Sequence, residues 1–407
     1  MKKLPLFLLS FFPVASTAFA EATVKLGGSL DTQYGVVKQG SQFKENKEGQ
    51  LLRNRGLVNN GKIKLEIDYA TESDFKYGGM VEFNANTSKS KSGSQTILNK
   101  SMMYVEYNIG RFEAGTHDGA AGKFREQVFA PLDVATGGAW GGDSLFWMNK
   151  YTKTGKENGS VYILSPDLVV AHDASGSANK ISYYSPKYNG IQVGLTYVPD
   201  AAVKGTVNEA MKKPDSVFSA APSNTLNYDE KPGYKNVFDL SIKYEIDIQD
   251  VKIASFVTGE MGKSKKYDHN GTINARRPLR AWDAGSVFSY KGFSLGGSYG
   301  SWRHSGVYKS FDKSVKQHSS FYTLGAGYSC GDLSTSITYF SSRAAAGIAG
   351  GTKQYGYDKA KLLSLGVEYK LMPGFKPYAE VTSFNLGENN QRPNRGVVAL
   401  FGTKLSF

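Results

Sequence analysis

The chain has 407 residues, a net charge of +13 and one cysteine, Cys330. A single cysteine excludes a scaffold of intrachain disulfides, and beyond residue 20 no stretch approaches the roughly 20 consecutive apolar residues that a membrane-spanning helix requires. The 46 glycines, 25 tyrosines and 23 phenylalanines, set against 13 prolines, favour strands and turns over helices.

The first 20 residues have the pattern of a secretory signal. Lys2 and Lys3 precede the apolar run from Leu4 to Val14, and residues 18–20 read Ala-Phe-Ala. The apolar run is too short to cross about 30 Å of hydrocarbon as a helix. We therefore predict a signal peptide at residues 1–20, cleaved after Ala20. Residues 21–407 are predicted to form a single domain.

From there on, apolar and polar residues alternate with a period of two, as in strands with two different faces. Within residues 361–371, for example, Leu363, Leu365 and Val367 share one parity, and Ser364 and Gly366 share the other. Sixteen segments have this pattern, and they begin near Ala22, Val58, Lys76, Ser101, Arg111, Asn179, Ile191, Val237, Val251, Pro278, Phe293, Ser319, Leu333, Lys361, Phe375 and Arg395.

Short and long connections alternate between these segments. The short ones are tight turns rich in Gly, Pro, Asn and Asp, at residues 108–110, 247–250, 291–292, 331–332 and 372–374. The long ones are polar and include residues 35–57, 199–235, 260–277 and 343–360. One end of the sheet therefore has short turns and the other has long loops, an asymmetry typical of outer-membrane barrels.

Alternation alone leaves open which face lies inside. A soluble sandwich would bury the apolar face, whereas a membrane barrel would turn it outward. Glycines on the polar parity would leave room for a lumen, and an even number of strands closes the sheet without an unpaired edge in lipid. These glycines are Gly194, Gly325, Gly327, Gly366 and Gly402.

Every second strand ends in an aromatic residue just before a tight turn or at residue 407. Aromatic rings at one end of alternate strands favour the membrane arrangement, because they form a girdle at one interface. The girdle residues are Tyr69, Tyr107, Tyr183, Tyr244, Tyr290, Tyr328, Tyr369 and Phe407.

The final strand and two internal passages resemble the general bacterial porins of Gram-negative cells. The strand runs from Val397 to Phe407 with its apolar residues on the parity of Phe407, and the passages are residues 179–200 and 363–385. The resemblance implies a homotrimer of 16-stranded antiparallel transmembrane β-barrels in the outer membrane. It also implies that Phe407 is read by the barrel-assembly machinery, and that the third long loop folds into the lumen and narrows it.

The candidate for that loop is the longest connection, residues 116–178, with an extra hairpin expected around residues 160–164. In porins, acidic residues of the loop face basic residues of the wall. The resemblance therefore implies a constriction with Asp118, Glu126, Asp133 and Asp143 on the acidic side, and with Arg53, Arg55, Lys64 and Arg111 on the basic side. Lys64 and Arg111 have inward parity, whereas Arg53 and Arg55 can belong to the first loop instead.

The net charge leaves +11 without Lys2 and Lys3. A net positive charge favours interaction with nucleic acid, anionic lipid or anionic solutes. The predicted export argues against nucleic acid, so contact with lipopolysaccharide or a basic pore lining remains. The charge favours anions slightly, and the acidic loop could reverse this preference.

An enzyme is not expected, and neither is a metal site or a cofactor. The five histidines lack metal-ligand spacing, and the sequence has no G-x-S-x-G nucleophile elbow. The resemblance implies a water-filled porin for passive diffusion of small hydrophilic solutes and ions. The alternative is a surface adhesin or receptor that uses the barrel as a platform for its external loops.

Overall fold

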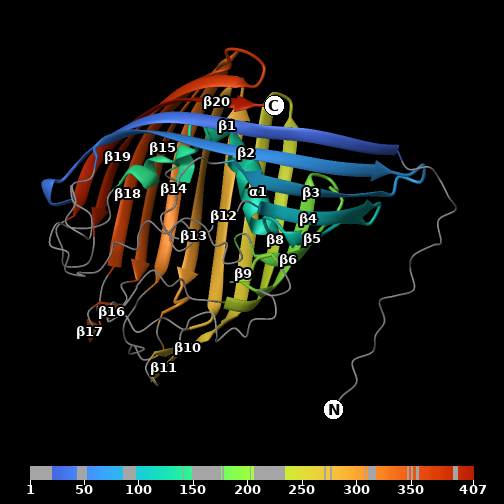
Figure 1. Ribbon diagram of the computed structural model, residues 1–407, viewed down its shortest axis with the longest axis horizontal. Coiled ribbons are helices and arrows are strands. Elements are labelled where there is room, and N and C mark those ends of the chain that lie inside the picture. Colours follow the sequence, from blue (N-terminus) through green and yellow to red (C-terminus); the bar gives the residue numbers. More distant parts are fainter. Residues whose placement is uncertain are drawn as a thin grey trace.

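The computed structural model is a closed barrel of sixteen antiparallel strands (Figure 1). It describes residues 21–43, 53–85, 98–140, 142–148, 176, 178–201, 203–205, 234–269, 272–275, 277–307, 309, 318–345, 348–349, 352–353, 357–387 and 393–407. The predicted signal peptide and the predicted extra hairpin lie outside these residues. No helix in the described ranges is long and apolar enough to cross a membrane.

The barrel strands confirm the sixteen predicted segments, and each begins within four residues of its predicted start. Their bounds are β1 (Glu21–Gln39), β2 (Arg55–Ala70), β3 (Lys76–Asn84), β4 (Leu98–Tyr107), β5 (Gly110–Thr116), β6 (Asn179–Tyr184), β7 (Ile191–Asp200), β8 (Tyr234–Ile248), β9 (Val251–Ser264), β12 (Leu279–Tyr290), β13 (Phe293–Arg303), β14 (Ser319–Cys330), β15 (Leu333–Ala345), β18 (Tyr357–Tyr369), β19 (Phe375–Gly387) and β20 (Asn394–Ser406). Two small hairpins, β10 (Lys266–His269) with β11 (Thr272–Ala275) and β16 (Ile348–Ala349) with β17 (Thr352–Lys353), belong to long connections.

The barrel closes where β1 pairs with β20, from Ser29 opposite Ser406 to Gln39 opposite Gly396. Phe407 continues this ladder: its amide donates to the carbonyl of Gly28 at 3.1 Å and its carbonyl accepts from the amide of Gly28 at 2.9 Å. The first residues of β1 pair with β2 only, and the two strands project past the end of β20 (Figure 1).

The outward parity of the strands is apolar. Val24, Leu26 and Met103 are 64%, 67% and 73% exposed. Exposed apolar surface costs about 25 cal/mol per Å² in water, so a continuous exterior of this kind suits hydrocarbon. The sandwich alternative, which buries this face, is wrong.

The inward parity differs from the predicted polar lining near the long-loop end. Phe340, Leu362 and Phe384, on β15, β18 and β19, are at most 3% exposed. They are buried because the third long connection folds inside the barrel and packs Trp140 and Trp147 against the wall. The elements in the described part of this connection are α1 (Ala120–Phe129), η2 (Ala130–Leu132), η3 (Gly138–Trp140) and α2 (Ser144–Trp147).

Several inward glycines receive this loop rather than leave empty lumen. A Cβ on Gly194 would lie 2.6 Å from the Cβ of Ala120. One on Gly366 would lie 3.0 Å from the carbonyl oxygen of Val134. The absent side chains therefore let the loop lie directly on the wall, which alternation of residue types could not reveal.

The eight predicted girdle residues lie at the turn end of the barrel. Four of them are clearly exposed: Tyr107, Tyr290, Tyr369 and Phe407 at 45%, 48%, 45% and 60%. Others pack against rings on adjacent strands, with ring centroids 4.9 Å apart for Tyr69 and Tyr77, 4.8 Å for Tyr183 and Phe112, and 4.3 Å for Tyr328 and Phe293. Tyr244 is half-buried. Their contact with a membrane interface remains a prediction.

Candidate pore constriction

The inward loop begins at a helix that the barrel wall holds by its first turn. The amide of Ala120 donates to the hydroxyl of Thr196 at 3.0 Å, and the amide of Ala121 donates to Oδ2 of Asp239 at 2.8 Å. The first amides of a helix have no partner within the helix, and its N-terminus favours a negative charge. The inward carboxylate of Asp239 on β8 therefore fixes the start of α1.

A buried ion pair holds the middle of α1. Nε of Arg125 lies 2.9 Å from Oδ2 of Asp283 on β12, and the two residues are 6% and 0% exposed. Phe124 packs edge-on against Tyr184, and Phe129 packs against Phe256 at 6.0 Å between ring centroids. Polar and apolar contacts thus press the same helix against β6, β9 and β12.

Two inward glutamates hold the second half of the loop. Oε2 of Glu380 on β19 accepts from the amide of Thr136 at 3.1 Å, and its Oε1 accepts from the hydroxyl of Ser144 at 2.8 Å. Glu368 on β18 accepts from the amide of Ala135 at 3.2 Å. The ammonium of Lys404 donates to the carbonyl of Ala135. This stretch is therefore tied to the strands that close the barrel.

The loop then reaches β1. The indole of Trp147 in α2 donates to Oε1 of Gln33 at 2.8 Å, and the amide of Gln33 donates to Oδ2 of Asp143 at 3.1 Å. The ring of Trp147 also lies on Gly35, where a Cβ would come within 2.4 Å of it. From α1 to α2, the described part of the loop thus follows the inner wall of the barrel from β6 to β1.

These anchors are acidic groups on the wall, whereas the sequence predicts basic groups on the wall opposite the loop. Asp239, Asp283, Glu368 and Glu380 all bind the loop, and none was among the predicted site residues. Their signal was present in the sequence, because each carboxylate has inward parity on a strand. What the sequence did not contain was the path of the loop that brings donors to them.

The four predicted acidic residues are spread along the loop rather than gathered in one cluster. Burial raises the pKa of Asp118, but the ion pair with Lys100 of β4 outweighs it and holds the pKa below its usual value. Glu126 is exposed on α1. Burial, followed by the nearby Glu126 carboxylate, raises the pKa of Asp133 to about 7. Burial also raises the pKa of Asp143, against the hydrogen bond from Gln33.

The four predicted basic residues divide into two groups. Arg111 lies inside the barrel, between Glu106 at 3.1 Å and Glu113 at 2.9 Å, and Lys64 lies inside in an ion pair with Glu66. Arg53 and Arg55 are exposed at the long-loop end of β2. Arg55 shares the parity of Leu57, which is 71% exposed, so the structure does not bring it to the loop.

Two basic residues missed by the sequence analysis do lie beside the predicted acids. Lys100 pairs with Asp118, and the charge of Lys404 lowers the pKa of both Asp133 and Asp143 against their burial. Lys100 and Lys404 have inward parity, as Lys64 does, so parity alone could not separate the three lysines. Lys100 and Lys404 differ from Lys64 only in lying beside the loop.

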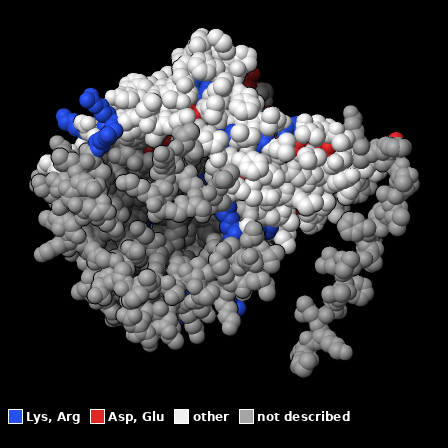
Figure 2. All heavy atoms as spheres, viewed as in Figure 1, with Lys and Arg blue, Asp and Glu red and all other residues white. Residues whose placement is uncertain are grey.

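A charged, accessible stretch of the wall remains on β2, beside Glu82 of β3. The side chains of Lys62 and Lys64 are 53% and 41% exposed, and Lys62 lies 3.9 Å from Glu82. The described loop packs mainly on β6–β9, β12–β15, β18, β20 and β1. Toward the turn end, a cavity of 490 Å³ lies between α1 and β4–β7, lined in part by Arg111, Glu113 and Lys123. Basic and acidic side chains lie interspersed on the described surface in view (Figure 2).

Comparison with known proteins gives relatives of matching length. A protein of Rickettsia conorii is 27% identical over 97% of this chain and 94% of its own, and one of Rickettsia bellii is 29% identical over 81% and 80%. Among solved structures, the anion-selective porin from Comamonas acidovorans matches with a TM-score of 0.57 at 14% identity, covering 95% of this chain and 100% of its own. A loop-deletion mutant of the Vibrio cholerae outer-membrane protein OmpT matches with a TM-score of 0.56 at 11% identity, covering 95% and 99%. At these identities the solved structures show the fold alone.

A family model settles the relationship. The model described as Gram-negative porin matches residues 6–389. Because that match spans nearly the whole chain, the chain belongs to the Gram-negative porin family, and its sixteen strands form an outer-membrane β-barrel channel.

Proposed function

We propose that the barrel is an open, water-filled channel for passive diffusion of small hydrophilic solutes and ions, with a slight preference for anions. The observation that carries the proposal is the one-sided course of the inward loop. Its described part packs mainly on β6–β9, β12–β15, β18, β20 and β1, and on the inner face of β2 the side chains of Lys62 and Lys64 stay exposed. The solute path runs between the loop and this charged wall.

The preference for anions rests on the excess of basic residues and on the neutral state of Asp133 below its raised pKa of about 7. Because the wall also carries Glu66 and Glu82, the preference is small. Charges in water are screened within about 10 Å at 0.1 M salt, so only those beside the path contribute.

Liposome swelling with neutral sugars of increasing size tests whether the path is open. Reversal potentials under a salt gradient test whether the channel prefers anions or cations. We expect fast entry of small sugars, a size cut-off, and a reversal potential on the anion side. Replacing Lys62 and Lys64 by glutamate should move the reversal potential toward cations. The control replaces Lys291, which lies at the turn end and is 62% exposed. Liposomes that do not swell would favour the adhesin or receptor alternative.

We also propose that the porin assembles as a homotrimer and that Phe407 directs barrel assembly. The ladder from Phe407 to Gly28 supports the second point, because it completes the pairing of the closing strands. Deleting Phe407 should leave export intact and reduce the amount of heat-modifiable barrel in the outer membrane. Normal amounts of such barrels would contradict the role of this residue.

A further inference from the structure

The cavity of 490 Å³ toward the turn end lies inside the barrel, beside α1. Its volume falls within the range of about 300–1,000 Å³ that small-molecule sites have. Charged groups of both signs line it: Glu106 of β4, Arg111 and Glu113 of β5, Lys123 of α1 and Lys187 of the turn between β6 and β7. A solute in this cavity therefore meets partners for a negative and for a positive group.

Glu113 is the counter-charge that fixes two of these cations. Its side chain is only 3% exposed, its Oε1 accepts from Nε of Arg111 at 2.9 Å, and its Oε2 accepts from the ammonium of Lys123. The guanidinium of Arg111 also lies 3.6 Å from the centre of the Tyr104 ring. Because both oxygens of Glu113 are occupied, it holds Arg111 and Lys123 side by side as a cationic corner.

Donors of this cationic corner and the carboxylate of Glu106 remain open to the cavity. Described groups engage only Nε and Nη1 of Arg111, so Nη2 is available to a solute. Glu106 accepts from Arg111 through Oε2 at 3.1 Å, and its Oε1 has no partner in the described part of the chain. The Glu106 side chain is 38% exposed. The two signs of charge thus flank a single guanidinium.

From this arrangement we propose that the cavity is a saturable binding site for free α-amino acids in their zwitterionic form. The carboxylate of the amino acid accepts from Nη2 of Arg111 and from Lys123, and its ammonium donates to Oε1 of Glu106. An α-amino acid carries both charges on one carbon, so it can reach both sides of the same guanidinium.

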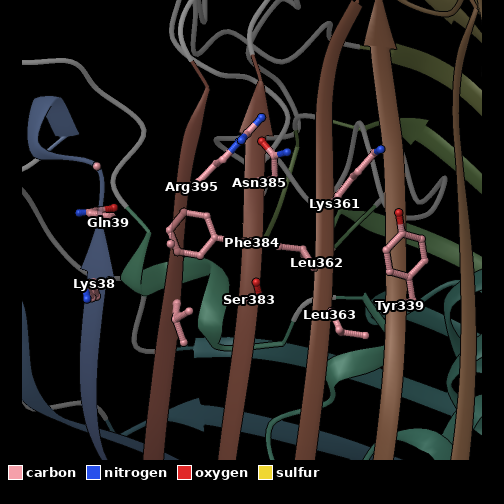
Figure 3. Close-up of a pocket in the computed structure, with 13 residues that line it drawn as sticks. Lys38, Gln39, Tyr339, Lys361, Leu362, Leu363, Ser383, Phe384, Asn385 and Arg395 are labelled. Carbon is pink, nitrogen blue, oxygen red and sulfur yellow. The ribbon is translucent and has the colours of Figure 1, made fainter.

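The balance of charge favours a zwitterion over a simple anion. Three lining cations face two lining carboxylates, which leaves a net charge of only +1. A simple anion would lie beside Glu106 without offering it a counter-charge. The hollow of 830 Å³ on the outer surface of the barrel is different (Figure 3). Lys38, Lys361 and Arg395 line it without a carboxylate among its described residues, so it has no partner for an ammonium.

The rest of the cavity suits a polar side chain. Gln127 of α1 and Gln192 of β7 line it. Lys243 engages Oε1 of Gln127, and the carbonyl of Ser185 engages Nε2 of Gln192. Nε2 of Gln127 and Oε1 of Gln192 are therefore available. L-Glutamine is a suitable probe, because its side-chain amide both donates and accepts.

Titration of the purified full-length protein in detergent with L-glutamine, followed by saturation-transfer NMR, tests the site. Two analogues each lack one charge: N-acetyl-L-glutamine has no ammonium, and L-glutaminamide has no carboxylate. We expect saturable binding of L-glutamine and about tenfold weaker binding of each analogue. Absence of saturable binding would overturn the site, and equally tight binding of either analogue would overturn the zwitterion as its ligand.

Substitutions then assign each charge to a residue. E106Q should bind L-glutamine about tenfold more weakly and N-acetyl-L-glutamine as the unchanged protein does, because this analogue lacks the ammonium that Glu106 holds. K123Q should weaken L-glutamine and leave L-glutaminamide unaffected for the corresponding reason. Retained binding of the analogues excludes misfolding as the cause of a loss. K361Q, on the outer surface, is the control and should bind all three probes normally. Equal losses for all probes in E106Q, or a loss in K361Q, would overturn the assignment.

The amino acid reaches the cavity through the channel that we propose, so the site rests on that function, but the two can fail separately. Binding in detergent requires no conductance. A protein that binds L-glutamine in liposomes that do not swell would contradict the open channel alone. A protein that conducts and shows no saturable binding would contradict the amino-acid site alone.

Discussion

Asp133 lies between η2 and η3 with its Oδ1 buried and without a hydrogen-bond partner among the described groups. Burial, then the Glu126 carboxylate, raises its pKa to about 7, and Lys404 opposes this shift. The raised pKa means that the carboxyl is neutral below about pH 7 and negative above it. Since Asp133 belongs to the inward loop, one charge of the constriction changes in this range.

We therefore predict that the preference for anions falls as the pH rises from about 6 to about 8. Two unit charges about 4 Å apart in bulk water interact by about 1 kcal/mol, so the permeability ratio should change by up to about fivefold. The measurement is the reversal potential under a fixed salt gradient at both pH values. D133N should remove this dependence, and a variant that retains all of it would show that another group titrates.

A second residue-scale prediction concerns the buried pair of Arg125 and Asp283. Replacing Arg125 by methionine leaves Asp283 buried without its counter-charge, a loss of about 3–5 kcal/mol in docking α1 to the wall. We expect single-channel currents with greater noise and occasional larger conductance states. The double variant R125M/D283N should be quieter than R125M, because no unpaired charge remains. Identical noise in both variants would mean that the pair does not hold the helix.

At the scale of elements, the position of α1 depends on a glycine on the wall. A Cβ at Gly194 would overlap Ala120 and come within 3.2 Å of the ring of Phe124. We predict that G194V displaces the helix into the lumen or loosens it, and thereby changes the single-channel conductance. The matched control is G259A, where the nearest atom to the new Cβ is 3.9 Å away. Unchanged conductance in G194V would show that the barrel absorbs the extra side chain.

The strands could be predicted from the sequence because their signal is local. The period of two and the turn residues fixed all sixteen strands, and the short and long connections fixed which end carries the loops. Parity also placed Lys64 and Arg111 inside correctly. The same count, extended from Leu57, would have placed Arg55 outside.

The path of the inward loop could not be predicted in the same way. It depends on contacts between residues far apart in the chain, such as Ala121 with Asp239 and Thr136 with Glu380. The alternation of residue types predicts a polar inner face, but the inner faces of β15, β18 and β19 are apolar near the long-loop end. This apolar surface is stable inside the barrel because Trp140 and Trp147 cover it. A pattern of single residues does not contain these pairings.

At the scale of the whole molecule, the outer and inner surfaces of the barrel carry different arrangements of charge. Outward charges on the described strands are basic and lie at the long-loop end, whereas inward charges of both signs line the wall and hold the loop. The first arrangement suits an anionic leaflet. The second keeps a hydrated path while fixing the segment that narrows it.

In the channel that we propose, the loop narrows the lumen without sealing it. Planar-bilayer recording on the purified, full-length protein tests this most directly. We predict large, stable conductance steps, with three equal sublevels closing in turn at high voltage if the homotrimer is the conducting unit. A correctly folded, heat-modifiable barrel that inserts into the bilayer and gives no conductance steps would contradict it.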